Sequence, residues 1–242
     1  MIQSESVSTQ EVNARQERAE RILDAAADLY QRHGYKRVTI DDIAEGAEIG
    51  KGTIYLHWKT RQALSMAVME REFLNGLEEL VAFIHEDPQE ALLHRMTYNL
   101  FLGVMKRPLL HALYTSDWEM LGKLTKSGTS SKFMSQMSMA SNGYLPLLVE
   151  FGLIQPGITT DELAYAYRAT VGGFFITDAF LEDKNSIDIE RRASLLSAIV
   201  QRAFEVDPPP SPQVVQALAP RVIAVWEKIA SEVRARLRQA YE

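Results

Sequence analysis

The stretch from Thr39 to Leu64, TIDDIAEGAEIGKGTIYLHWKTRQAL, predicts two short helices and the start of a third. Thr39 suits the N-cap of the first helix, because its hydroxyl can accept a hydrogen bond from a free backbone N–H near Asp42. The run from Ala47 to Gly50 forms the turn before the second helix. One face of the first helix is apolar, with residues at helical spacing: Ile40, Ile43, Ala44 and Ala47.

The second helix, from Lys51 to Trp58, has one side that can be anchored. Ile54 and Trp58 are four residues apart and therefore face the same way, toward the first helix. The major groove of a DNA duplex admits one α-helix and presents donors, acceptors and thymine methyl groups. The pattern favours a helix-turn-helix, with a helical hairpin inside a larger core as the alternative. The outward side carries Lys51, Thr53, Tyr55, Leu56 and His57.

A longer run, ERILDAAADLYQRHGYKRVTIDDIAEGAEIGKGTIYLHWKTRQAL, begins at Glu20 and contains this unit. It resembles the DNA-binding domain of the TetR-like (tetracycline-repressor-like) transcriptional regulators over about residues 17 to 65. In that family the third helix reads the major groove, and the first and fourth helices carry it. The sequence departs from the family pattern at Gly50, at Trp58 and at the pair Arg61-Gln62. Gly50 leaves the exact start of the reading helix uncertain.

The resemblance and the helical pattern together imply specific DNA contacts. We expect Thr53, Tyr55 and His57 to face base edges, with Leu56 as a contact for a thymine methyl group. Gly52 has no side chain and lets the backbone approach a phosphate. Phosphate contacts position a protein without specifying sequence, and we assign them to Lys51, Lys59, Arg61 and the Thr39 hydroxyl.

The composition agrees with an all-α intracellular protein of two units. The 242 residues suffice for a small domain and a larger one with a real core. The chain has no cysteine, which fits a reducing compartment. We find no apolar run long enough to span a membrane and no secretory signal. We therefore expect a cytoplasmic location.

The net charge of −6 is acidic for a DNA-binding protein, but it is unevenly distributed. Residues 15–62 hold nine basic and eight acidic side chains, whereas residues 63–242 hold 17 basic and 22 acidic ones. The acidic excess therefore lies outside the expected DNA-binding unit. A basic face on that unit is still required for phosphate contact.

The pattern along the chain predicts five segments. Residues 1–13 are polar and predict a disordered arm. Residues 14–62 form the DNA-binding domain, and residues 63–206 form a helical effector-binding and dimerisation domain. Residues 207–212 (DPPPSP) form a stiff spacer, and residues 213–242 form an amphipathic helix beyond the minimal family core. The apolar stripe of that helix must be covered, either by the chain's own core or by a dimer partner.

Two helices, at about 160–182 and 187–204, are the last long helices before the spacer. In TetR-like proteins the corresponding pair meets its copy across a two-fold axis as a four-helix bundle. The resemblance therefore implies a homodimer. The alternative is that both helices pack within one subunit.

The sequence lacks motifs for catalysis, and we expect no enzyme activity, no cofactor and no metal site. The five histidines show no metal-ligand spacing, and no nucleophile or phosphate-loop motif is present. Aromatic and methionine side chains could line a small-molecule pocket or fill a solid core. The candidates are Tyr98, Phe101, Met105, Tyr114, Trp118, Phe133, Met137, Tyr144 and Phe174, with His111 and Arg168 among possible polar contacts.

These observations predict a homodimeric transcriptional repressor that binds a palindromic operator and is released by a small-molecule effector. Two alternatives stay open. One is a ligand-independent regulator or activator of the same fold, and the other is a helical protein-interaction module whose helix-turn-helix no longer meets DNA.

Overall fold

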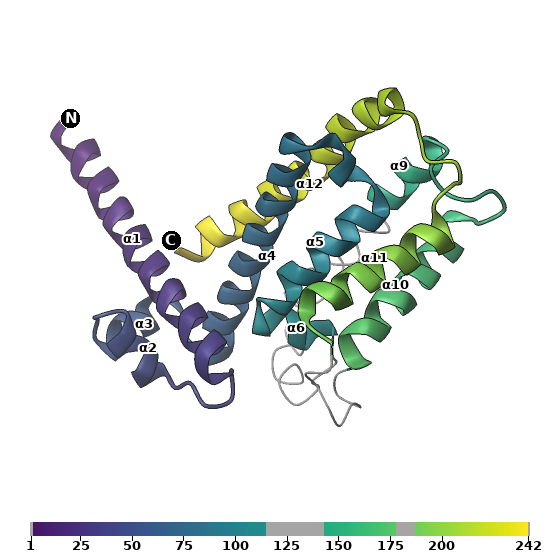
Figure 1. The fold of residues 1–242 in the computed structure, drawn as a ribbon. Helices are drawn as coiled ribbons and strands as arrows, with labels where there is room; N and C mark the ends of the chain where they lie inside the picture. Colours follow the sequence, from purple (N-terminus) through teal and green to yellow (C-terminus); the bar gives the residue numbers. More distant parts are fainter. Residues whose placement is uncertain (1, 115–142, 178–186, 242) are drawn as a thin grey trace.

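In the computed structural model the chain folds into helices (Figure 1). The structure describes residues 2–114, 143–177 and 187–241, with side chains over 13–112, 143–177 and 187–238. Within these residues the only extended pairing is one antiparallel bridge between Ile154 and Glu205. The predicted all-α fold is confirmed. None of the described helices is both long and apolar enough to cross a membrane.

The amino-terminal unit has the predicted arrangement of helices. It comprises α1 (Ile2–His33), α2 (Ile40–Gly46), α3 (Lys51–His57) and the start of α4 (Arg61–Glu86). Gly34, at φ +75°, ends α1 in the left-handed region that glycine adopts without strain. Thr39 and Asp42 form a reciprocal capping box at α2. The Thr60 hydroxyl accepts a hydrogen bond from the Ala63 N–H and begins α4.

Helix α1 corrects one of the predicted boundaries. We expected a disordered arm over residues 1–13 and a helix from Asn13, but α1 begins at Ile2. The composition of residues 2–12 predicts no buried face, yet the whole of α1 contains neither glycine nor proline. Because no glycine or proline interrupts the backbone, the helix can extend beyond the amphipathic part of its sequence.

Helix α4 links the amino-terminal unit to the rest of the molecule. All eight residues from Leu64 to Arg71 are buried, so this part of the helix is covered on every side. Further along, burial falls to one face, with Leu74, Leu77, Leu80 and Ile84. Helix α4 contacts α1, α5, α6 and α12, whose bounds follow below.

The second, larger unit is built from short and long helices around α4. It contains the 3₁₀ helix η1 (Pro88–Ala91), α5 (Leu93–Met105), α6 (Pro108–Tyr114), α9 (Tyr144–Glu150), α10 (Thr160–Thr177) and α11 (Ile189–Phe204). We predicted one helix from Asp87 to about Lys106. Asp87 does cap the Gln89 N–H, but an extended backbone at Leu92 separates η1 from α5.

Buried polar contacts fix α5 against α10 and α11. The Thr97 hydroxyl lies 3.0 Å from the Tyr167 hydroxyl. Glu205, which follows α11, accepts a hydrogen bond from the His94 N–H at 2.9 Å, and its second oxygen lies 2.7 Å from His94 Nδ1. Burial raises the pKa of Tyr167, and the hydrogen bond with Thr97 lowers it by a smaller amount, so that the pKa is about 12. These contacts make the larger unit one packed body.

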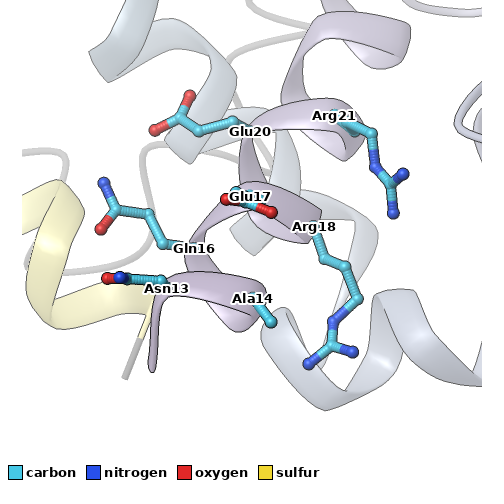
Figure 2. Close-up of a pocket in the computed structure, with 7 residues that line it drawn as sticks. All are labelled: Asn13, Ala14, Gln16, Glu17, Arg18, Glu20 and Arg21. Carbon is cyan, nitrogen blue, oxygen red and sulfur yellow. The ribbon is translucent and has the colours of Figure 1, made fainter. Parts of the chain in front are cut away.

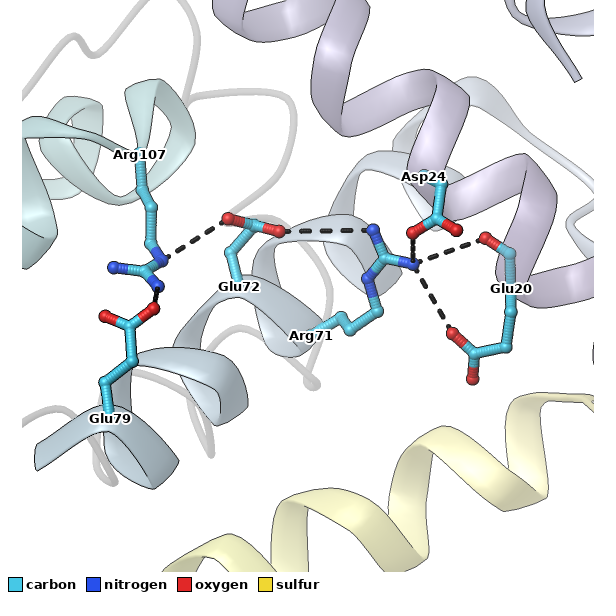
Figure 3. Close-up of polar contacts among 6 residues, drawn as sticks. All are labelled: Glu20, Asp24, Arg71, Glu72, Glu79 and Arg107. Atoms are coloured by element: carbon cyan, nitrogen blue, oxygen red, sulfur yellow. Dashed lines mark hydrogen bonds and ion pairs between the residues drawn. The ribbon is translucent and has the colours of Figure 1, made fainter. Parts of the chain in front are cut away.

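A chain of ion pairs joins the two units along α4 (Figure 3). Arg71 of α4 pairs with Asp24 of α1 at 2.7 Å and with the Glu20 carboxylate at 3.4 Å. Arg107, between α5 and α6, pairs with Glu72 of α4 at 3.4 Å and with Glu79. Both arginine side chains are about nine-tenths buried, so the removal of their carboxylate partners would be costly.

The last helix, α12 (Pro212–Tyr241), follows the proline-rich stretch and lies along α4 (Figure 1). It starts at the last residue of the predicted spacer, because proline is well suited to a first helical position. The apolar stripe of α12 packs on the chain's own core, which is one of the two possibilities that the sequence left open. Its buried apolar residues are Val215, Leu218, Ala219, Val222, Trp226, Ile229, Ala230, Val233 and Leu237.

Candidate nucleic-acid interface

Helix α3 is held by two apolar side chains and exposes most of the others. Ile54 is fully buried and Trp58 is 4% exposed, as the four-residue spacing predicted. On the outward side Tyr55 is 39% exposed and Leu56 is 66% exposed. Thr53 is half-buried beside them. The helix therefore presents a phenol, a leucine and a hydroxyl to the outside of the molecule.

The start of α3 has space on its outer side. A methyl group placed on Gly50 or Gly52 would meet no atom within 4 Å. Neither glycine has a positive φ. Within the described structure, nothing therefore requires a glycine at position 52. The absence of a side chain there is useful for the close approach of something outside the chain, such as a phosphate.

The predicted phosphate contacts at Lys51, Lys59 and Thr39 are exposed and lie around α3. Lys51 Nζ lies 2.8 Å from the Asp41 carboxylate, and this hydrogen bond raises the pKa of Lys51. Lys59 Nζ donates to the Tyr55 carbonyl at 3.2 Å. The Thr39 hydroxyl donates to Asp42 at 2.8 Å. Exposed pairs of this kind exchange at little cost, so the two ammonium groups can reach phosphates.

Arg61, which we expected to contact phosphate, packs against Tyr35 in the loop between α1 and α2. Its guanidinium donates a hydrogen bond to the Tyr35 carbonyl and lies 4.4 Å from the centre of the Tyr35 ring. These contacts hold the loop between α1 and α2 against the start of α4. The sequence predicted only the charge of Arg61. Its direction depends on the position of Tyr35, which lies 26 residues earlier.

His57 lies at the border of the exposed face and does not point fully outward. Its ring lies 5.3 Å from the Trp58 ring, and its Nδ1 is buried without a hydrogen bond to any described residue. Burial lowers the pKa of His57, and the positive charges of Arg15 and Arg18 lower it further. His57, which we predicted to face base edges, is therefore half-buried at the edge of the exposed face.

Arg15 and Arg18 belong to a part of α1 that lies near His57, at the end of α3. Figure 2 shows Arg18 and Arg21 on one side of α1 and Gln16 and Glu20 on the other. The described residues offer Arg18 and Arg21 no carboxylate partner within ion-pair distance. The first helix therefore places positive charge beside α3. Its acidic side, with Glu20, faces α4 instead.

Comparisons with known proteins agree with this geometry. Residues 22–68 match the family model for bacterial regulatory proteins of the tetR family. These residues include α2, α3 and the exposed face described above. In this part the chain resembles the TetR-like regulatory proteins. An HTH-type transcriptional regulator of Bacillus subtilis strain 168, YvkB, is 27% identical to it over 167 residues, which cover 68% of this chain and 84% of that protein.

A second relative matches the chain over a shorter stretch. The A-factor receptor protein of Streptomyces griseus is 35% identical over 51 residues, which cover 21% of this chain and only 18% of the receptor. Among solved structures, a protein from Saccharomonospora viridis in complex with choline has a TM-score of 0.58 at 20% identity. That likeness covers 79% of this chain and 99% of the other, and it supports the fold.

Some of the residues predicted to bind an effector come together in the larger unit. Phe101 is buried and stacks on Phe175, with ring centres 5.1 Å apart, and Phe174 meets Phe101 edge-on at 6.4 Å. His111 lies 6.1 Å from Phe175. Phe175 was absent from our predicted set, although it directly follows Phe174. Tyr98 and Met105 are half-buried on the same helix as Phe101.

Tyr144 does not belong to this aromatic group. Its hydroxyl donates to the Ala91 carbonyl at 2.9 Å, and its ring packs 5.6 Å from Trp226 of α12. It is therefore a core residue beneath α12, whereas we had placed it among the possible effector contacts. Trp118, Phe133 and Met137 lie outside the described residues, and so does the side chain of Tyr114.

A small apolar pocket lies between α4 and α5, with a volume of about 50 Å³. Phe73, Leu77, Leu80 and Phe83 line it from α4, and Leu100 and Val104 line it from α5. None of our predicted effector residues lines this pocket. Over the described part of the chain, no group of three or more His, Cys, Asp or Glu side chains is placed to hold a metal ion.

Proposed function

We propose that the chain is a homodimeric transcriptional regulator whose α3 helix reads a palindromic operator. The observation that carries this proposal is the exposed side of α3. Leu56 is 66% exposed and Tyr55 is 39% exposed, on a helix of seven residues that buries only Ile54. Tyr55 and Leu56 are neighbours that the described residues leave uncovered, so both side chains are available to a partner. A thymine methyl group and base edges are suitable partners.

The proposed dimer uses α10 and α11. Large apolar side chains are exposed on or beside these helices: Tyr165, Ile176, Ile187 and Ile199. The resemblance implies that this pair meets its copy across a two-fold axis. The symmetry of the dimer would then match two half-sites about 34–36 Å apart, one helical turn of DNA. With this function we propose a cytoplasmic location.

The proposed effector is a small organic molecule. The aromatic group around Phe101 and Phe175 supplies apolar surface, and His111 supplies a polar edge. A related regulator has been crystallised with choline, and another relative is named as a receptor for A-factor. Repression followed by release requires only that the effector favour a different spacing of the two α3 helices. By linkage, operator would then weaken effector binding by the same factor.

The test is selection of operator from random duplexes, followed by fluorescence anisotropy over a range of salt concentrations. Several phosphate contacts predict a steep fall in affinity as salt rises, with a slope of about −0.9 per phosphate. A protein-interaction module would show no selected sequence and no such slope. A ligand-independent regulator would bind operator equally tightly in the presence of every compound of an effector screen.

A further inference from the structure

The carboxy-terminal helix α12 contacts elements of both units. It lies against η1 and α9 of the larger unit, runs along α4, and reaches α1 of the DNA-binding unit. Figure 1 shows its carboxy-terminal end beside α1. With 30 residues it is about 45 Å long. A single helix therefore spans the joint at which the DNA-binding unit would have to pivot.

Both ends of α12 are docked by buried apolar side chains. At the end nearer η1 and α9, Leu218 and Val222 are fully buried. At the end nearer α1, Val233 is fully buried and Leu237 is 3% exposed. Arg221 is also paired with Glu150 of α9. The helix is therefore fixed along its length.

Two arginines near the end of α12 hold α4 where it enters the DNA-binding unit. Arg236 lies 3.4 Å from Glu70, and Arg234 pairs with Glu78. Glu70 is buried at 7% exposure. Burial raises the pKa of Glu70 and the Arg236 charge lowers it, so Arg236 compensates a carboxylate that is otherwise poorly solvated.

This contact lies on the stretch of α4 that is covered on all sides. Leu64 to Arg71 have α1 on one side, through Arg71 and Asp24, and α12 on another, through Glu70 and Arg236. A helix that is packed on one face can slide or tilt against its neighbour. A helix held between two others cannot tilt unless at least one of those contacts opens.

We propose that α12 is a brace that sets the angle between the DNA-binding unit and the larger unit, and thereby sets the half-site spacing that the dimer accepts. This inference rests on the proposed function for its DNA consequence, but its mechanical part does not. Each added base pair moves a half-site by about 3.4 Å along the DNA axis and by about 35° around it. A braced dimer tolerates little of this change, whereas a dimer without the brace tolerates more.

The test uses full-length protein with substitutions at neighbouring positions of α12. Leu237→Asp places a charge at a buried position near the carboxy-terminal end of α12. Ala235→Asp is the matched control, because it makes the same change of charge in the same turn at an exposed position. Arg236→Met is an independent variant that keeps most of the side chain's length and removes its charge. It remains informative if Leu237→Asp fails to fold.

The first measurement is amide hydrogen exchange of the free proteins. In Leu237→Asp and Arg236→Met, exchange over residues 64–71 should become about tenfold faster, while η1 and α9 stay as in the wild type. Ala235→Asp should behave as the wild type. Unchanged exchange over residues 64–71 in both variants would overturn the brace, whether or not the protein binds DNA.

The second measurement is affinity for selected operators with one or two base pairs added to or removed from the space between half-sites. The wild type and Ala235→Asp should prefer one spacing by about tenfold or more, and the variants should bind the whole series within about threefold. Variants that keep the wild-type preference would overturn the role in spacing. A wild type that binds no duplex would instead refute the proposed function, and the exchange experiment would still decide the brace.

Discussion

At the scale of single residues, a substitution at Gly52 should affect the stability of the protein and its DNA binding differently. A methyl group at this position meets nothing in the protein, and alanine favours a helix over glycine by about 0.5–1 kcal/mol. Gly52→Ala should therefore fold at least as stably as the wild type but bind operator about tenfold more weakly, because the methyl group occupies space that a phosphate needs. Thermal melts and anisotropy titrations measure the two quantities.

Gly76→Ala is the control for that prediction. Gly76 also lies within a helix, and an added Cβ would come no closer than 3.9 Å to Arg107. It lies in α4, away from α3, so its substitution should leave operator affinity unchanged. Equal affinity for Gly52→Ala and Gly76→Ala would mean that the surface around Gly52 does not approach DNA.

His57 should make the free energy of unfolding depend on pH. Burial, with Arg15 and Arg18, lowers the pKa of His57 below 6.5 in the folded protein. Below that pH the unfolded chain binds a proton more readily than the folded one, so this residue reduces the free energy of unfolding as the pH falls. His57→Gln should remove that part of the acid destabilisation, as denaturant melts at pH 7.5 and 5.5 can measure.

The cause of the shift can be tested separately by NMR titration of the His57 ring. In Arg15→Gln the pKa of His57 should rise toward its ordinary value, because one of the neighbouring positive charges has gone. A His57 pKa that does not move in Arg15→Gln would show that α1 does not lie beside the end of α3.

At the scale of secondary-structure elements, two helices in different units begin with the same kind of capping box, so that the effects of removing each can be compared. A capping box of Thr39 and Asp42 lies at the start of α2, and one of Thr159 and Glu162 lies at the start of α10. Thr39→Ala and Thr159→Ala should each lose about 1 kcal/mol of stability, a fall of about 2–4 °C in Tm. Only Thr39→Ala should weaken operator binding, because α2 supports α3. Equal operator affinity for the two variants would contradict this.

The helices that sequence predicted well are those with local signals. The cap at Thr39, the spacing of Ile54 and Trp58, and Gly34 at the end of α1 each act within a few residues, so α2, α3 and their turn followed from the sequence. The start of α1 did not, because residues 2–12 lack an apolar stripe in the sequence and also lack a helix breaker. The break at Leu92 likewise had no local signal.

The side-chain directions at the candidate site were less predictable for the same reason. Tyr55 and Leu56 are exposed as the helical pattern required, whereas Arg61 turns to Tyr35 and His57 is half-buried near Arg15 and Arg18. Tyr144 is taken into the core by the Ala91 carbonyl and by Trp226. Each of these differences depends on a contact with a residue that is distant in sequence. The spacing of apolar residues along a helix cannot predict such contacts.

At the scale of the whole molecule, the exposed side of α11 should control assembly. Ile199 is 45% exposed, and aspartate at this position would place a charge in the proposed two-fold interface. Ile199→Asp should be monomeric by light scattering at micromolar concentration, and should lose most of its affinity for a two-site operator while it keeps weak binding to a half-site. Gln201→Asp, exposed on the same helix, is the control and should remain dimeric.

The account as a whole depends on α3 reading bases, and Tyr55→Ala is the most direct test of that claim. The measurement is the ratio of affinities for the selected operator and for a scrambled duplex, at one salt concentration, for wild type and variant. We predict that the ratio falls by about tenfold or more, while binding to scrambled DNA and its salt dependence stay unchanged. A variant with the wild-type ratio would contradict the account.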